Sequence, residues 1–309
     1  MSLPRTDAPT TPSGPRPGDE THRGLLSRRP DDLTQAQKLM VFVLSMSLFG
    51  LANIVTEVFP EVTIGPIDLS VSYFVFVPLV MVCLFNPLYA ALGAPLGEIV
   101  FTDLLMGDFS GLAEIEGYLQ MFLALYLAGS IVRDPRRRGQ VALAAVVVVV
   151  VDKLLSALVD IGKVWVGIED AELVEGLPES IVAIEAVGLV VDVAISGVLF
   201  GVVPALWLVP RLYGKIEPLM GMSPRDPVEN PVPVLRVTAP TVLTGLVLVA
   251  AGTGFAFLEG IDANVGVWEP GFLDRFGTQF LWVGVGMACT AILAVVLVAR
   301  SVRERRRGR

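Results

Sequence analysis

Long apolar segments follow one another along most of this 309-residue chain, and they constrain its fold more than any other feature. Apolar residues make up 53% of the sequence and charged residues 17%, whereas soluble domains carry roughly 25% charged residues. A run of about 17–25 mostly apolar residues is typical of a helix that crosses a bilayer. Runs that are long enough, or nearly so, lie at residues 38–57, 70–85, 88–107, 117–133, 140–166, 181–209, 237–258 and 278–300. The sequence therefore predicts an all-α, polytopic membrane bundle of about eight transmembrane helices.

The basic residues give an independent test of this topology, because loops retained in the cytoplasm are enriched in Lys and Arg. Of the 23 basic residues, all but Lys153, Lys163 and Arg275 lie in the N-terminal part through Lys38, in the loops at 133–138 and 211–236, or at the C-terminal end. Lys153 and Lys163 fall inside the fifth span. This distribution predicts that both termini are cytoplasmic. The opposite face is acidic, which we interpret as solvation in preference to a funnel that attracts cations.

The composition changes along the chain predict five regions, and no cleavable signal peptide is expected near Met1. Pro-, Ser- and Thr-rich sequence is typical of a disordered tail, and clustered prolines are typical of a linker. The regions are a disordered cytoplasmic tail at 1–36, a six-helix membrane core at 37–210, a Pro-rich cytoplasmic linker at 211–236, a two-helix membrane appendage at 237–300 and a basic cytoplasmic tail at 301–309.

Several function classes are disfavoured by what the sequence lacks. The single histidine, His22, lies in the polar tail, which removes histidine-ligated metal sites and histidine-based nucleophilic catalysis. There is no GxxxxGK[ST] phosphate loop and no GxSxG elbow. A net charge of −8 argues against nucleic acid as the main partner. We therefore expect no enzyme activity, no cofactor and no resident metal.

Ionisable residues inside the spans are the strongest functional candidates, because each costs about 3 kcal/mol at the bilayer centre on insertion scales. Six acids and two lysines fall in spans three, five and six: Glu98, Asp103, Asp152, Lys153, Asp160, Lys163, Glu185 and Asp192. Full ionisation would leave about −4 in an apolar interior, which calls for a positive ligand, water or protonation. Two interpretations stay open. The charges form two buried salt-bridge layers between spans five and six, or they form a binding site or proton relay.

Polar and aromatic residues near the outer ends of the spans complete the candidate pocket. They are Asn53, Tyr73, Tyr118, Gln120 and Trp165. Tyr and Trp also gather at membrane interfaces for physical reasons alone, so an interfacial belt is the competing interpretation. The candidate substrate-binding set is Glu98, Asp103, Asp160, Lys163, Glu185, Asp192, Asn53, Tyr73 and Trp165. Separately, Gly93 and Gly97 have the small-xxx-small spacing that lets two helices approach closely.

Residues 40–135 carry an order of features that points to a known family. A first span is followed by the external loop TIGPIDLS at 63–70, a short apolar span, the segment NPLYAALGAPLGE at 86–98 and DLLMG at 103–107. This arrangement resembles the S component, the substrate-binding membrane subunit, of energy-coupling factor vitamin transporters. The family normally has six helices, so spans seven and eight are a departure from it.

The resemblance implies a subunit in the plasma membrane of a prokaryote that captures a vitamin, a vitamin precursor or another small polar or cationic solute from outside. ATP coupling would come from a transmembrane coupling subunit and ATPase subunits, and the loop at 63–70 would help to cover the solute. In that family small residues of helix one contact the coupling subunit, and here that helix offers Ser45, Ser47, Gly50 and Ala52.

Two other functions remain open from the sequence. A stand-alone secondary transporter would use Asp152, Asp192 or Glu98 as a proton or cation site. A non-transporting membrane scaffold would bind anionic lipid or a cytoplasmic partner through its basic tails.

Overall fold

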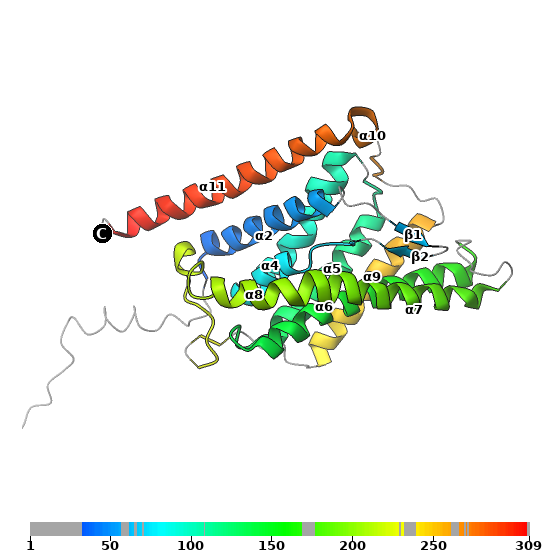
Figure 1. Ribbon diagram of the computed structural model, residues 1–309, viewed down its shortest axis with the longest axis horizontal. Helices are drawn as coiled ribbons and strands as arrows, with labels where there is room; N and C mark the ends of the chain where they lie inside the picture. Colours follow the sequence, from blue (N-terminus) through cyan, green and yellow to red (C-terminus); the bar gives the residue numbers. More distant parts are fainter. Residues whose placement is uncertain are drawn as a thin grey trace, which may run out of the picture. The chain divides into compact units, whose positions relative to one another are not determined.

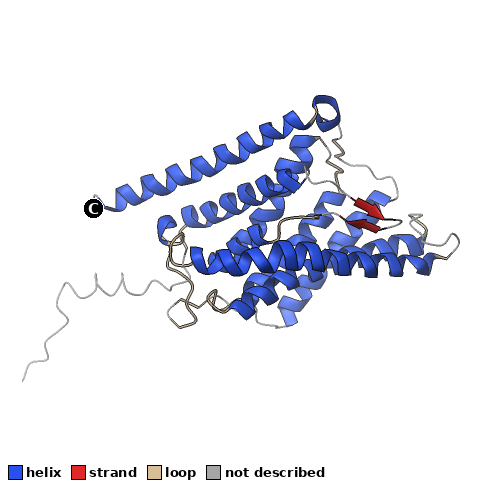
Figure 2. Ribbon diagram, in the orientation of Figure 1, coloured by secondary structure: helices blue, strands red, loops and turns tan. Residues whose placement is uncertain are grey.

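Helices account for most of the described chain, and their order follows the expected apolar segments (Figures 1 and 2). The computed structural model describes residues 33–56, 62–64, 67–69, 71–107, 109–168, 177–228, 230–231, 239–260, 266–268, 270 and 272–307. Most of the expected N-terminal tail and most of the expected external acidic loops lie outside these residues.

The helices begin and end close to the expected bounds. In chain order they are α2 (Gln35–Thr56), α3 (Phe76–Leu84), α4 (Pro87–Glu98), α5 (Ala113–Ile131), α6 (Arg138–Val166), α7 (Ile181–Asp192), α8 (Val203–Leu212), α9 (Ala239–Gly260), α10 (Phe272–Phe276) and α11 (Leu281–Arg307). Short 3₁₀ turns are η2 (Pro178–Ser180), η4 (Pro218–Met220) and η5 (Thr278–Phe280), and strands β1 (Val62–Ile64) and β2 (Ile67–Leu69) form an antiparallel hairpin. The expected helical fold is confirmed.

Among the residues that the structure describes, four helical runs are long and apolar enough to cross a membrane, judged by length and composition. They are Gln35–Thr56, Arg138–Val166, Pro178–Leu212 and Pro240–Leu258. The span expected at 70–85 contains only nine helical residues, because its first part, at 71–74, is not helical. Asn86 is the N-cap of the next helix, since its side chain accepts a hydrogen bond from the Leu88 N–H at 3.0 Å and Pro87 follows it.

Two of the expected spans contain π-helical segments, and each segment begins directly after an acidic residue. The segment η1 (Ile99–Leu104) follows Glu98, and η3 (Val193–Val202) follows Asp192. The helical geometry runs through them, so α7, η3 and α8 form one continuous run. A π-helical stretch changes the rotation between the residues on either side and is often found at functional sites.

Helices α2 and α4 pack with their backbones almost in contact, as the small-residue spacing predicts. A Cβ added at Gly93 would overlap the carbonyl oxygen of Phe42, and one at Gly97 would overlap that of Met46. The Ser45 hydroxyl donates to the Ala90 carbonyl at 2.7 Å across the same interface. Glycine is therefore required on α4, because any larger side chain would force the helices apart.

The last two helices cover different sides of the preceding ones and do not form a separate pair. Helix α9 packs on α5 and α6, and the Phe257 ring lies against Gly162. Helix α11 runs along α2, where Gly284 meets Ile54 (Figure 1). Each of these two helices therefore packs on helices of the expected six-helix core.

The first part of the expected linker, up to Arg225, packs against the end of the bundle where α2 begins. The Gln37 amide at the start of α2 donates to the Gly221 carbonyl at 2.7 Å, and the Tyr213 hydroxyl donates to the Arg225 carbonyl at 2.5 Å. Met220 and Met222 belong to the buried apolar core. The segment was predicted to be a Pro-rich linker, and its described part buries two methionines and Arg225.

Arg225 joins the helix ends at this side of the molecule. Its guanidinium is 4% exposed and donates to the carbonyl oxygens of Phe85, Gly129 and Val132, just after α3 and at the end of α5. Burial lowers the pKa of Arg225 to about 10, and attraction to the fully buried Glu217 opposes this shift. The side chain therefore stays charged at neutral pH.

Replacing Arg225 with Met is expected to destabilise the protein by about 3–5 kcal/mol, because the carbonyl oxygens of Phe85, Gly129 and Val132 lose their donor and the buried Glu217 side chain loses the attraction of the guanidinium. Adding Glu217→Gln should recover the part of this loss that comes from Glu217. Thermal unfolding of both single variants and the double variant in detergent measures the coupling, with exposed Lys215→Met as the control. Strictly additive losses would show that the two side chains do not interact.

Candidate functional site

The five residues before α3 thread into the bundle and carry two hydroxyl groups to two different carboxyl groups. The Ser72 hydroxyl donates to Asp192 Oδ1 at 2.6 Å, and the Tyr73 hydroxyl donates to Asp152 Oδ2 at 2.8 Å. One short segment therefore reaches both α6 and α7.

Tyr73 lies at the centre of this arrangement. Its side chain is 3% exposed, and its ring packs edge-on against Phe49 of α2 with centroids 6.1 Å apart. The Lys153 ammonium lies over the same ring, 5.7 Å from its centroid. The neighbouring Asp152 is also buried. A tyrosine with its hydroxyl on one carboxyl group and its ring facing a cation holds both groups in a fixed position.

Further carboxyl groups surround this tyrosine. Glu98 and Asp192, the two acids that precede the π-helical segments, both interact electrostatically with Tyr73, and Asp192 also interacts with Asp152. We call Ser72, Tyr73, Glu98, Asp152, Lys153 and Asp192 the Tyr73 cluster. Its three carboxyl groups face one ammonium group, so complete ionisation would leave an excess of negative charge. An ionised carboxylate accepts about four hydrogen bonds, and one hydroxyl donor each for Asp152 and Asp192 leaves acceptor positions for further donors.

A second polar layer lies about two helical turns away, toward the end of α6 and the start of α7. Glu185 interacts electrostatically with Asp160, Lys153 and Asp192, and the Ser156 hydroxyl donates to Asp160 at 3.4 Å. Lys163 is half-buried near the end of α6. Lys153 faces Tyr73, with Asp152 and Glu185 as its charged neighbours.

Three further members of the candidate set lie on α6, α2 and η1. Trp165 exposes 60% of its side chain at the end of α6, as an interfacial belt residue would. Asn53 is buried on α2, and Asp103 is half-buried in η1. In the part of the chain that the structure describes, Asn53 Oδ1 is buried and accepts no hydrogen bond.

Tyr118 and Gln120, which were also expected near the outer ends of the spans, make contacts within or next to α5. The Tyr118 hydroxyl donates to the Leu92 carbonyl at 3.1 Å, and Gln120 donates to Glu116 at 2.5 Å. Gln120 also lines a small, mostly apolar pocket between α5, α6 and α9, together with Leu155 and Thr253. None of the residues that line this pocket belongs to the Tyr73 cluster.

Ser72 is the residue that sequence reasoning missed. A single serine beside an aromatic residue gives no sequence signal, and its role depends on the extended segment that precedes a short α3. Among the described residues, no group of three or more Asp, Glu, Cys or His side chains is placed to hold a metal ion. The cluster is thus arranged for hydrogen bonding and charge attraction.

The small residues of the first span are occupied by packing within the chain. Ser45, Ser47, Gly50 and Ala52 are all buried, and Gly50 lies directly against Gly97 and Phe101. In this conformation they present no surface to another subunit.

Comparison with known proteins gives a family and no relative of known activity. No curated protein and no solved structure matches the chain. The model of a family of unknown function, DUF8171, matches residues 40–308. This match covers all of the helices described above except the start of α2, and the chain belongs to that family.

Proposed function

We propose that this chain is a multi-pass protein of the cell membrane that binds a small polar or cationic solute in the Tyr73 cluster. The observation that carries the proposal is the pair of hydrogen bonds from Ser72 and Tyr73 to Asp192 and Asp152. The buried Asp152 and the half-buried Glu98 and Asp192 come from three different helices, and ionisable groups at membrane depth are costly unless they are paired or functional. A solute with N–H donors or positive charge would supply the donors that the carboxylates can still accept.

The proposed topology has eight spans and cytoplasmic termini. The four long apolar runs support membrane insertion, and the regions rich in Lys and Arg favour one cytoplasmic side. Contacts from Lys38 to Tyr89, from Gln37 to Gly221 and from Arg225 to the ends of α3 and α5 bring basic regions together at that side. The hairpin β1–β2, the end of α6 and the start of α7 lie at the other end (Figure 1).

Within this proposal the chain acts as a capture subunit like an S component, with ATP coupling supplied by a membrane coupling subunit and ATPase subunits. It has no catalytic role and holds no cofactor. The alternative is a stand-alone transporter in which Asp152, Asp192 or Glu98 binds a proton or cation. The burial of Ser45, Ser47 and Gly50 favours this alternative, because these residues are not available to a coupling subunit.

A thermal-stability panel on the purified protein tests solute binding. We expect cationic or neutral compounds such as thiamine, choline or riboflavin to raise the unfolding temperature, while the anions biotin and pantothenate leave it unchanged. A ligand at one hundred times its Kd adds about 2.7 kcal/mol to the stability of the form that binds it. A rise produced only by the anions would contradict the proposed site. No response to any compound would favour a scaffold in which the polar layers hold helices together.

A further inference from the structure

An apolar stripe on the outer surface of the η3–α8 run ends in an arginine. Leu199, Val203 and Trp207 are all more than half exposed, and Arg211 follows them at the same spacing of four residues. Residues four apart on a helix share one face, so the four side chains form a line about 18 Å long. In a membrane protein an exposed apolar line of this kind faces lipid. The Arg211 guanidinium lies over the Trp207 ring, 3.8 Å from its centroid, which fixes its position and leaves its N–H edge free.

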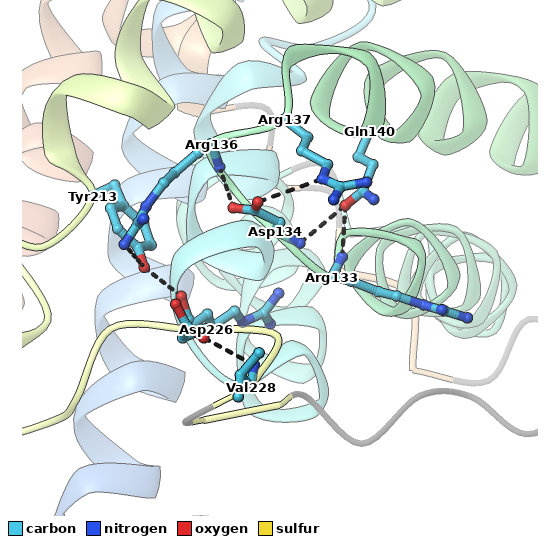
Figure 3. A network of polar contacts seen from close by, with 9 residues as sticks. Arg133, Asp134, Arg136, Arg137, Gln140, Tyr213, Asp226 and Val228 are labelled. Atoms are coloured by element: carbon cyan, nitrogen blue, oxygen red, sulfur yellow. Dashed lines mark hydrogen bonds and ion pairs between the residues drawn. The ribbon is translucent and has the colours of Figure 1, made fainter.

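More positive charge lies close to the end of this stripe. The Arg136 guanidinium lies over the Tyr213 ring at 4.7 Å and donates to the Tyr213 hydroxyl at 3.1 Å (Figure 3). Tyr213 is two residues from Arg211, and the exposed Lys215 follows two residues later. The exposed Arg136, Arg211 and Lys215 therefore all lie near the end of α8, on the proposed cytoplasmic side.

Two carboxyl groups, those of Asp134 and Asp226, lie nearby and balance part of this positive charge. Asp134 accepts from the Arg136 backbone N–H at 3.0 Å and pairs with Arg137 at 3.6 Å, and Asp226 accepts from the Val228 N–H at 2.8 Å (Figure 3). Asp226 also attracts Arg136 at longer range. Positive charge remains in excess at this surface, so it favours an anionic partner.

We propose that Arg136, Arg211 and Lys215 bind the headgroup of an anionic phospholipid of the cytoplasmic leaflet, with an acyl chain along Leu199, Val203 and Trp207. The stripe and the three cations match the two chemical parts of one lipid molecule. A free phosphate would contact the cations but not the exposed apolar side chains beside them. This inference rests on the proposed membrane location, and it is independent of solute binding in the Tyr73 cluster.

The test uses fluorescence of Trp207 in the full-length protein. Changing the exposed Trp165, Trp268 and Trp282 to Phe leaves Trp207 as the only tryptophan. The protein is placed in vesicles that contain brominated phosphatidylglycerol or brominated phosphatidylcholine, and the quenching of Trp207 is compared. We expect a clear preference for phosphatidylglycerol. Arg136→Gln or Lys215→Gln, which do not touch Trp207, should each reduce this preference about fivefold.

The exposed Arg300 of α11 provides the matched control, since Arg300→Gln removes a cation from the same proposed side of the membrane. Equal quenching by the two lipids, or an equal loss of preference in the Arg300 variant, would overturn the proposal. Loss of the preference when millimolar glycerol phosphate is added would show that the site recognises a soluble phosphate, which would also overturn it. Solute binding, measured separately by the thermal panel, should be unchanged in all of these variants.

Discussion

Replacing Gly97 with Ala is expected to disrupt the packing of α2 on α4 and to destabilise the protein by about 3 kcal/mol or more. The added Cβ would overlap the carbonyl oxygen of Met46, and it would also approach the backbone of Gly50 at 3.0 Å. Because both obstacles are backbone atoms, no rotation of a side chain can relieve the overlap. Thermal unfolding in detergent, together with the yield of monodisperse protein, measures the effect.

Gly117→Ala on α5 is the matched control for this variant. Gly117 is exposed and helical, and an added Cβ there meets no atom within 4 Å. Alanine should therefore be neutral or stabilising by about 0.5–1 kcal/mol at this position. If Gly97→Ala behaved like Gly117→Ala, the close approach of α2 and α4 would be refuted.

Replacing Asp192 with Asn is expected to weaken binding of a cationic solute by about 10–100-fold, while the protein stays folded. A hydrogen bond to a charged group is worth about 1.5–3 kcal/mol, and this range corresponds to that loss of affinity. Asparagine keeps an oxygen that accepts the Ser72 hydroxyl, so the segment before α3 should remain in place. The measurement is a titration of the thermal shift with whichever cation responds in the panel.

Glu179→Gln is the control for loss of an acidic side chain elsewhere in the same helical run, and it tests whether any such loss weakens solute binding. Glu179 is exposed and lies at the start of the helical run that contains Asp192. Its variant should bind like the wild type. If Asp192→Asn lowered the unfolding temperature and left affinity unchanged, the carboxyl group would have a purely structural role.

The helical architecture could be predicted from the sequence because it depends on local composition. Eight apolar segments match the positions of α2 to α9 and α11, and the small residues at Gly93 and Gly97 predicted the close helix contact. The two polar layers between α6 and α7 were also predictable, since Asp152, Asp160, Glu185 and Asp192 stand at matching depths on adjacent antiparallel helices.

The contacts that complete the candidate site depend on longer-range geometry. Ser72 and Tyr73 reach their partners because the chain before α3 is not helical, and an apolar pattern cannot distinguish such a segment from a helix. The π-helical segments after Glu98 and Asp192 likewise have no recognisable periodic pattern in the sequence. Arg225 was counted as a topology residue, and its burial became evident only from the carbonyl groups around it.

Mass spectrometry of the small molecules that co-elute with the purified protein tests solute binding most directly. Wild-type protein should retain a polar or cationic compound, and Glu98→Gln and Asp192→Asn should lose it while Glu179→Gln keeps it. If the wild type carries no such compound, and no compound in the panel raises its unfolding temperature, the account is contradicted. The Tyr73 cluster would then be a set of buried polar contacts that holds α3, α6 and α7 together.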